Sequence, residues 1–247
     1  MIVAIRVLMS CFVLGLGFTF SVAWGDLVVD RTRIIIQSPA REVSLQILNA
    51  GEYPVVVQSW LDLGDTTIDP NLLNLSLTSL PPLVRLSPQE VRAIRIVGIP
   101  PAEKKNEENE SLYWLNLQEI PLSDRREAMG AMIAVSTRLR LKVFNRTAAL
   151  VEGSEEAIFR LSCVAEQRRG GVNVSCRNPS YFHITIDSLV LQSRGGEKKI
   201  DGTMLYPGSQ TNFYFGDVLS GVDSVLIKVI DDHGLLRFRR FKVEKIN

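Results

Sequence analysis

The sequence predicts an all-β fold made of two sandwich-type domains. Short runs of β-branched and apolar residues recur about every 8–12 residues, and Gly, Pro, Asn and Asp separate them. No long stretch after residue 25 has the 3.6-residue apolar period of a helix. Alternation is lost over 145–150, and the polar segment 152–156 follows before new runs begin. This break predicts one domain over 26–149 and a second over 150–247.

The first 25 residues have the composition of a secretory signal peptide. Arg6 precedes an apolar stretch over 7–22, and Ala23 and Gly25 supply the small residues of a cleavage site. We see no second apolar segment of the about 20 residues that a membrane-spanning helix needs. The sequence therefore predicts an exported protein that loses residues 1–25 and is not embedded in a membrane.

Turn signals bound each predicted strand of the first domain. Residues 72–80 fit a short helix or a strand, and the charged segment 102–110 is typical of a solvated loop. The predicted strands cover residues 27–29, 32–36, 43–48, 55–61, 84–86, 91–96 and 111–117.

The longest alternating stretch lies at 128–144. Fully extended it would measure about 50 Å, against about 17–20 Å for a common strand. Its even positions change from small or apolar residues to a basic stripe of Arg138, Arg140 and Lys142. Two interpretations remain open: a central strand buried on both faces, or a strand that pairs with another chain. The odd positions form the apolar row Met129, Ala131, Ile133, Val135, Leu139, Leu141 and Val143, with Thr137 as its weak member.

The second domain also shows strand-type alternation. Cys163 and Cys176 flank 168–171 symmetrically, so a hairpin that turns there places them opposite each other. Export favours a disulfide between them, and two buried free thiols are the alternative. The predicted strands cover 158–164, 172–177, 182–186, 188–192, 211–215, 224–230 and 236–243.

Residues and motifs typical of catalytic or metal-binding sites are sparse in this sequence. The chain has 2 histidines, His183 and His233, and it lacks HExxH, paired Cys-x-x-Cys and GxSxG motifs. We therefore predict that the protein is not an enzyme and holds no metal and no cofactor. Removing Arg6 from the 28 basic residues leaves 27, against 27 acidic residues, and this balance argues against a nucleic-acid partner.

Two basic residues occupy unusual positions. Arg33 lies in a strand that otherwise consists of isoleucines, and Lys142 ends the basic stripe. Both side chains could be ordinary exposed charges on strands. Alternatively, they converge between the domains and hold a carboxylate, for which the Arg fork and the compact Lys charge form a suitable pair.

A set of short segments runs through nearly the whole chain after the leader. They are DRTR (30–33), PVVVQSW (54–60), PPLVRLSP (81–88), ESLYWLN (110–116), LKVF (141–144), NPSY (178–181) and IDDHG (230–234). In order and spacing, this set resembles the periplasmic chaperones of the chaperone-usher pathway, which fold and deliver pilus subunits. The moderate loop before the long strand and the lack of a cysteine pair in the first domain indicate the short-loop subclass.

The resemblance implies two immunoglobulin-like sandwiches in an L or boomerang shape with a cleft between them. It also implies a periplasmic location, pilus subunits and an outer-membrane usher as partners, and donation of a strand to an incomplete subunit. The resemblance does not decide whether the free protein forms a dimer in which each copy covers the subunit-binding edge of the other. The alternative hypothesis is a structural pilus subunit or an immunoglobulin-like surface adhesion module.

The resemblance also assigns roles to residues. A one-residue slip would turn every donated side chain away, so a clamp on the subunit's C-terminal carboxylate would set the register. The implied assignments are Arg33 and Lys142 as this clamp, Ala131, Ile133 and Val135 as donors, and Glu110, Arg146 and Asp232 as a charge network between the domains.

Overall fold

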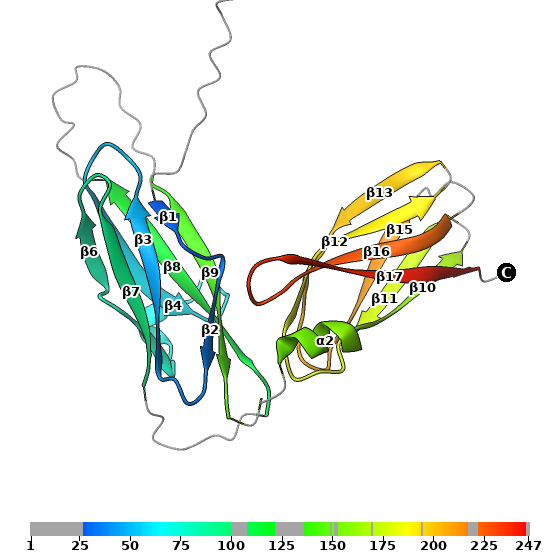
Figure 1. The fold of residues 1–247 in the computed structure, drawn as a ribbon, viewed down its shortest axis with the longest axis horizontal. Helices are drawn as coiled ribbons and strands as arrows, with labels where there is room; N and C mark the ends of the chain where they lie inside the picture. Colours follow the sequence, from blue (N-terminus) through cyan, green and yellow to red (C-terminus); the bar gives the residue numbers. More distant parts are fainter. Residues whose placement is uncertain are drawn as a thin grey trace, which may run out of the picture.

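The computed structural model describes residues 27–99, 108–121, 136–148, 150, 153–168, 170–193, 195–216 and 222–245. Within these ranges the chain forms two β-sandwiches set at an angle to each other (Figure 1). The predicted all-β class with two sandwiches is confirmed. The expected signal peptide, 1–25, and the expected donors Ala131, Ile133 and Val135 lie outside the described residues.

The first sandwich packs a four-stranded sheet against a five-stranded sheet, and apolar residues at every second position fill the space between them. Ile34, Leu115 and Val143 are fully buried in this core. The segment 72–80 was expected to form a helix or a strand. Its first residue, Leu72, is the last residue of a short 3-10 helix, η1 (Pro70–Leu72), and its last four residues form a strand, 77–80. The four-stranded sheet has the order β1 (Leu27–Val29), β3 (Glu42–Asn49), β7 (Val91–Gly98) and β5 (Leu77–Leu80), and the five-stranded sheet has the order β2 (Arg33–Gln37), β9 (Arg138–Arg146), β8 (Ser111–Pro121), β4 (Val55–Asp62) and β6 (Leu83–Leu86).

Strand β9 is the described end of the long alternating stretch. Leu141 and Val143 face the core, and the basic stripe lies on the opposite face of the sheet. On one side β9 pairs with β8 from Arg138 to Asn145. On its other side the parallel strand β2 begins only at Lys142, so among the described residues no strand covers the β9 edge over 138–141.

The second sandwich is one sheet that folds over on itself. Strand β17 joins its two layers, because it pairs with β16 in antiparallel fashion and then with β10 in parallel fashion. The order is β13 (Gly196–Asp201), β12 (Ile184–Ser193), β16 (Val222–Ile230), β17 (Leu236–Lys245), β10 (Ser162–Arg168), β11 (Gly171–Arg177) and β15 (Gln210–Gly216), and β14 (Met204–Leu205) pairs with β12.

Two local expectations for this sandwich are wrong, and two of its strands were missed. The strands expected at 182–186 and 188–192 form the single strand β12, with a register shift between Ile186 and Ser188. Strand β13 was missed because GEKKID is a polar edge strand without apolar alternation, and β14 was missed because two residues are too few to show alternation. Residues 158–160 belong to helix α2 (Ser154–Arg160) rather than to a strand.

Helix α2 follows the predicted break between the domains. Its first turn carries Glu155 and Glu156, and Arg160 ends it, which suits the helix dipole and allows an i,i+4 ion pair between Glu156 and Arg160. Ala157 and Ile158 are buried against the second core. Seven residues are too short for a helical period to stand out from the neighbouring strand pattern.

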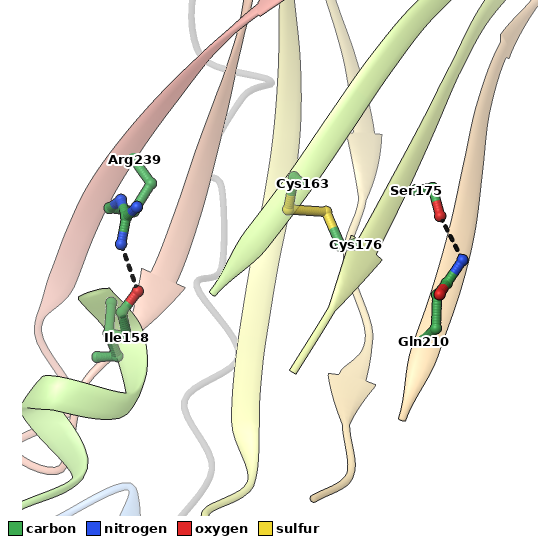
Figure 2. The surroundings of a disulfide bond; sticks show 6 residues. All are labelled: Ile158, Cys163, Ser175, Cys176, Gln210 and Arg239. Carbon is green, nitrogen blue, oxygen red and sulfur yellow. Dashed lines mark hydrogen bonds between the residues drawn. A yellow bond between two sulfur atoms is a disulfide. The ribbon is translucent and has the colours of Figure 1, made fainter. Parts of the chain in front are cut away.

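The expected disulfide is present. Cys163 of β10 and Cys176 of β11 are directly paired across the antiparallel hairpin, with their Cα atoms 4.1 Å apart. Figure 2 shows that the disulfide lies between these two strands and that Arg239 of β17 points toward the carbonyl of Ile158. Arg239 Nη1 donates a hydrogen bond to that carbonyl at 2.7 Å. The disulfide therefore cross-links the hairpin, while Arg239 ties α2 to the sheet.

A buried asparagine closes a similar turn in each sandwich. Asn49 Nδ2 donates to the carbonyl of Tyr53 at 2.8 Å, and Asn178 Nδ2 donates to the carbonyl of Phe182 at 2.7 Å. In the second sandwich this turn holds the residue that follows it, His183, against the first sandwich.

Candidate functional site

Arg33 and Lys142 lie side by side where the two sandwiches meet. The parallel register pairs them directly, so both side chains leave the same face of the sheet. Arg33 is only 8% exposed, and its Nη1 donates to the carbonyl of Ile230, at the end of β16, at 3.1 Å. Its buried Nε has no hydrogen-bond partner. Arg33 is therefore a buried cation with a donor left unused.

Lys142 is half-buried and has weak contacts. Its Nζ lies 3.4 Å from Oγ1 of Thr185 on β12 and 5.5 Å from the centroid of the Trp114 ring on β8. Within the part of the chain that the structure describes, neither Lys142 nor Arg33 forms an ion pair. The two basic residues thus converge between the domains, and their binding of a carboxylate stays a prediction.

The electrostatics of this pair favour an anion. Burial lowers the pKa of the Arg33 guanidinium, and burial together with the charge of Arg33 lowers the pKa of Lys142 to about 8. Two adjacent cations that have lost part of their hydration repel each other, and an anion bound to both would offset that repulsion. A carboxylate can accept hydrogen bonds from a guanidinium and an ammonium at once.

The three residues of the predicted network are in contact between the sandwiches. Arg146 Nε donates to Oε1 of Glu110 at 2.7 Å, and its Nη1 and Nη2 donate to Oδ2 and Oδ1 of Asp232 at 2.6 and 2.8 Å. The second carboxylate oxygen of Glu110 accepts from the backbone nitrogen of His183 at 2.8 Å and lies 3.0 Å from its Nδ1. Ser154 Oγ also donates to Asp232.

Burial and pairing act in opposite directions on this network. Burial alone would raise the pKa of Asp232 and lower that of Arg146. The hydrogen bonds from Arg146 and Ser154 outweigh it for Asp232, whose pKa is lowered, and the partners Asp232 and Glu110 raise the pKa of Arg146. Both charged forms are therefore favoured, and the network joins β8 and β9 to the β16–β17 turn.

The remaining basic residues of β9 stack on tryptophans of neighbouring strands. The guanidinium of Arg138 lies 4.6 Å from the ring centroid of Trp60 on β4, and that of Arg140 lies 4.8 Å from the ring of Trp114. Arg140 Nη2 also donates to both carboxylate oxygens of the buried Asp62, at 2.9 and 3.2 Å. The basic stripe is therefore a row of stacked cations.

Sequence reasoning did not find several contributors to the site. The carbonyl of Ile230 belongs to a backbone position, and Thr185 has no distinctive sequence context. The contact of His183 with Glu110 could not be inferred from the order of residues along the chain. Two segments that the sequence singled out lie in this part of the second domain: NPSY at 178–181, whose turn precedes His183, and IDDHG at 230–234. Gly234 in it has φ +80°, and a Cβ there would lie 2.7 Å from Oγ1 of Thr32, just before β2.

Each of the two sandwiches matches a known protein family. Residues 26–150 match the family described as "Pili and flagellar-assembly chaperone, PapD N-terminal domain", and residues 159–238 match "Pili assembly chaperone PapD, C-terminal domain". Together the two ranges cover most of the chain. Among the described residues, no helix is long and apolar enough to cross a membrane.

The individual relatives that the chain resembles are also named as chaperones. The chain is 28% identical over 201 residues to the probable fimbrial chaperone YadV of Escherichia coli K12, covering 81% of each chain. It is 27% identical over 233 residues to the chaperone protein MrkB of Klebsiella pneumoniae, covering 92% of this chain and 94% of MrkB. The crystal structure of the YadV chaperone has a TM-score of 0.71 at 25% identity, covering 88% of this chain and all of that one (100%). A Salmonella enterica structure, the SafA pilin in complex with the SafB chaperone, has a TM-score of 0.72 at 21% identity, covering 89% and 97%, and so shares the fold.

Proposed function

Because the chain belongs to the family of pili and flagellar-assembly chaperones, we propose that it is a periplasmic chaperone that binds and caps pilus subunits and delivers them to an outer-membrane usher. It acts by lending an edge strand to a subunit that lacks one. We also propose the division into an N-terminal domain over 26–149, which carries the subunit-binding edge, and a C-terminal domain over 150–247. The other hypothesis, a structural subunit or adhesion module, has no counterpart among the relatives reported above, which are named as chaperones.

One observation supports this mechanism above the others: strand β2 starts at the cation pair. From Lys142 onward β2 occupies the edge of β9, and before Lys142 that edge is uncovered among the described residues. A partner strand on the uncovered edge must therefore end where Arg33 begins. When that strand runs parallel to β9, in line with β2, the end that meets Arg33 is its C-terminus, and its carboxylate lies beside the two cations.

The carboxylate clamp and the donated side chains work together. Ala131, Ile133 and Val135 share the odd-numbered row of Leu139 and Leu141, so a continued β9 strand would direct them toward the same side. There they fill the gap in the subunit's core, and the clamp at Lys142 keeps them from slipping by one residue. When no subunit is bound, the same edge could be capped by a second copy of the chain, which yields a dimer.

The charge network supports the clamp from the second domain. Arg33 is held by the carbonyl of Ile230, two residues before Asp232, which binds Arg146. The network therefore fixes the distance between the β16–β17 turn and β2, and with it the position of the Arg33 guanidinium.

The test is co-purification of exported subunits with the tagged protein from periplasmic extracts. We expect Arg33→Ala, Lys142→Ala and the double variant to fold but to lose subunit capture. Arg138→Ala is the matched control, because Arg138 is an exposed cation on the same face of the same strand, stacked on Trp60. We expect it to capture at least half as much as the unaltered protein, since exposed charges contribute little.

A second variant tests strand donation separately from the clamp. Ile133→Glu would place a charge in the apolar core of the subunit and should abolish or strongly reduce capture. Undiminished capture by the Arg33/Lys142 double variant would refute the clamp, and undiminished capture by Ile133→Glu would refute the donor role.

A further inference from the structure

Trp114 occupies the centre of a row of residues that crosses the five-stranded sheet. The strand registers pair Asp62 with Trp114, Trp114 with Lys142, and Lys142 with Arg33. Directly paired residues on neighbouring strands extend from the same face, so the four side chains are consecutive neighbours. Trp114 is thus the residue beside Lys142 on the side away from Arg33.

The ring of Trp114 is held in place from several sides. A Cβ on Gly64, whose φ is +104°, would lie 3.1 Å from the indole Nε1, so the 62–64 turn passes close to the ring edge. The Arg140 guanidinium lies over the ring at 4.8 Å and is anchored by the bidentate hydrogen bond to Asp62. Asp62 is in turn buried and accepts from Asn116 Nδ2 at 2.7 Å. These contacts fix the indole plane independently of Lys142.

Lys142, by contrast, has little else to hold its ammonium group. It has a flexible four-carbon stem, its hydrogen bond to Thr185 is long at 3.4 Å, and Arg33 repels it. The face of an indole ring attracts a cation within about 6 Å, and this attraction is stronger where water is partly excluded. The ammonium lies 5.5 Å from the ring centroid.

We propose that Trp114 is a positioning residue of the carboxylate clamp: its indole ring holds the Lys142 ammonium beside Arg33 and stabilises its charged form before a subunit arrives. This inference depends on the proposed function for the meaning of the clamp. The interaction of Trp114 with Lys142 itself is a property of the free protein. It can be measured without any subunit.

The charged groups around Lys142 allow the interaction to be isolated. Arg33 on β2 lowers the pKa of Lys142, and Arg140 on its own strand is neutralised by Asp62 of β4. On the second domain Lys142 faces the uncharged Thr185 of β12. Farther along β9, Arg146 engages Glu110 and Asp232, and His183 is hydrogen-bonded to Glu110.

The direct test is the pKa of Lys142 in the free full-length protein, followed by NMR of the lysine side chain. Burial and the charge of Arg33 lower the pKa of Lys142 to about 8. Because Trp114 favours the charged form, Trp114→Leu should lower this pKa further, by about half to one unit, and Trp114→Phe should lower it less. Trp60→Leu is the matched control, because Trp60 stacks on Arg138 instead, and it should leave the Lys142 pKa unchanged.

Fluorinated tryptophan separates the electronic effect from packing, because fluorine withdraws electron density from the ring face with little change of shape. In a Trp60→Phe background, Trp114 is the only tryptophan after residue 25. Increasing fluorination of Trp114 should lower the Lys142 pKa stepwise while the thermal unfolding midpoint stays constant. A Lys142 pKa that is the same in all fluorinated forms would overturn the proposal, and this test holds even if Trp114→Leu does not fold.

The consequence for capture is a shift in its pH profile. The amount of subunit that co-purifies with the unaltered protein should fall as the pH rises through the Lys142 pKa. In Trp114→Leu this fall should begin about half to one pH unit lower. At fixed pH near 8, the charged fraction of Lys142, and with it the subunit retained, should be about two- to fivefold lower in the variant. If the Lys142 pKa falls in Trp114→Leu but capture does not depend on Lys142 at all, the positioning contact is real and the proposed clamp is wrong. If the Lys142 pKa is unchanged in Trp114→Leu but capture depends on Lys142, the clamp is supported and the positioning role of Trp114 is refuted.

Discussion

Replacement of Arg146 by Met removes the centre of the charge network while keeping most of the side-chain volume. The Arg146 side chain is 7% exposed and that of Glu110 is 0% exposed, so Glu110 is left as a buried carboxylate without its cation. Loss of one partner from a buried ion pair costs about 3–5 kcal/mol. Glu110 still accepts two hydrogen bonds from His183, and the Asp232 side chain, 25% exposed, can be hydrated. We therefore expect a loss near the lower limit, about 3 kcal/mol.

The measurement is urea unfolding at neutral pH with Arg95→Met as the control. Arg95 and Glu42 form a pair at 3.4 Å whose side chains are 53% and 55% exposed, and such pairs contribute about 0–1 kcal/mol. The double variant Glu110→Gln/Arg146→Met should recover about 1–2 kcal/mol of the loss, because the neutral amide costs less to bury than the carboxylate. If Arg146→Met were no more destabilising than Arg95→Met, the network would not contribute the stability that its burial predicts.

Two further outcomes follow from the contacts of the second domain. The Cys163→Ala/Cys176→Ala variant should be less stable by about 3 kcal/mol in urea unfolding, because the disulfide closes a short loop with a sequence separation of 13, and an unchanged unfolding midpoint would contradict a stabilising role. The folded-state pKa of Asp232 is lowered from 3.8, so its contribution to stability is fully present above that value and is lost as the pH falls through the folded pKa. Acid unfolding curves of Asp232→Asn should accordingly show a weaker loss of stability on acidification than those of the unaltered protein, and parallel curves would argue against the network as its source.

The disulfide and most strands could be predicted because their signals are local. Alternation with period two and intervening turn residues indicated nearly every strand of the first sandwich, and the symmetric spacing of Cys163 and Cys176 around 168–171 predicted their pairing. The predictions failed where local pattern and packing disagree. Strand β13 is polar because it is an exposed edge, and α2 is too short to show a helical period.

Some features of the candidate site could likewise be predicted from the sequence, and others could not. The sequence by itself determined that this chain is an all-β protein of the pilus-chaperone family, with an alternating stretch over 128–144 that is apolar in its first half and carries a basic stripe in its second, because these properties depend on residue order alone. Only the tertiary structure decided that Arg33 is bound by the carbonyl of Ile230, 197 residues away, and that Lys142 lies beside Trp114 and Thr185. These contacts depend on strand register and on how the two sandwiches meet. Register is set by the burial of apolar side chains within each sandwich, and the meeting of the sandwiches involves hydrogen bonds and ion pairs between residues far apart in the sequence, such as Arg146 with Asp232, which no local pattern records.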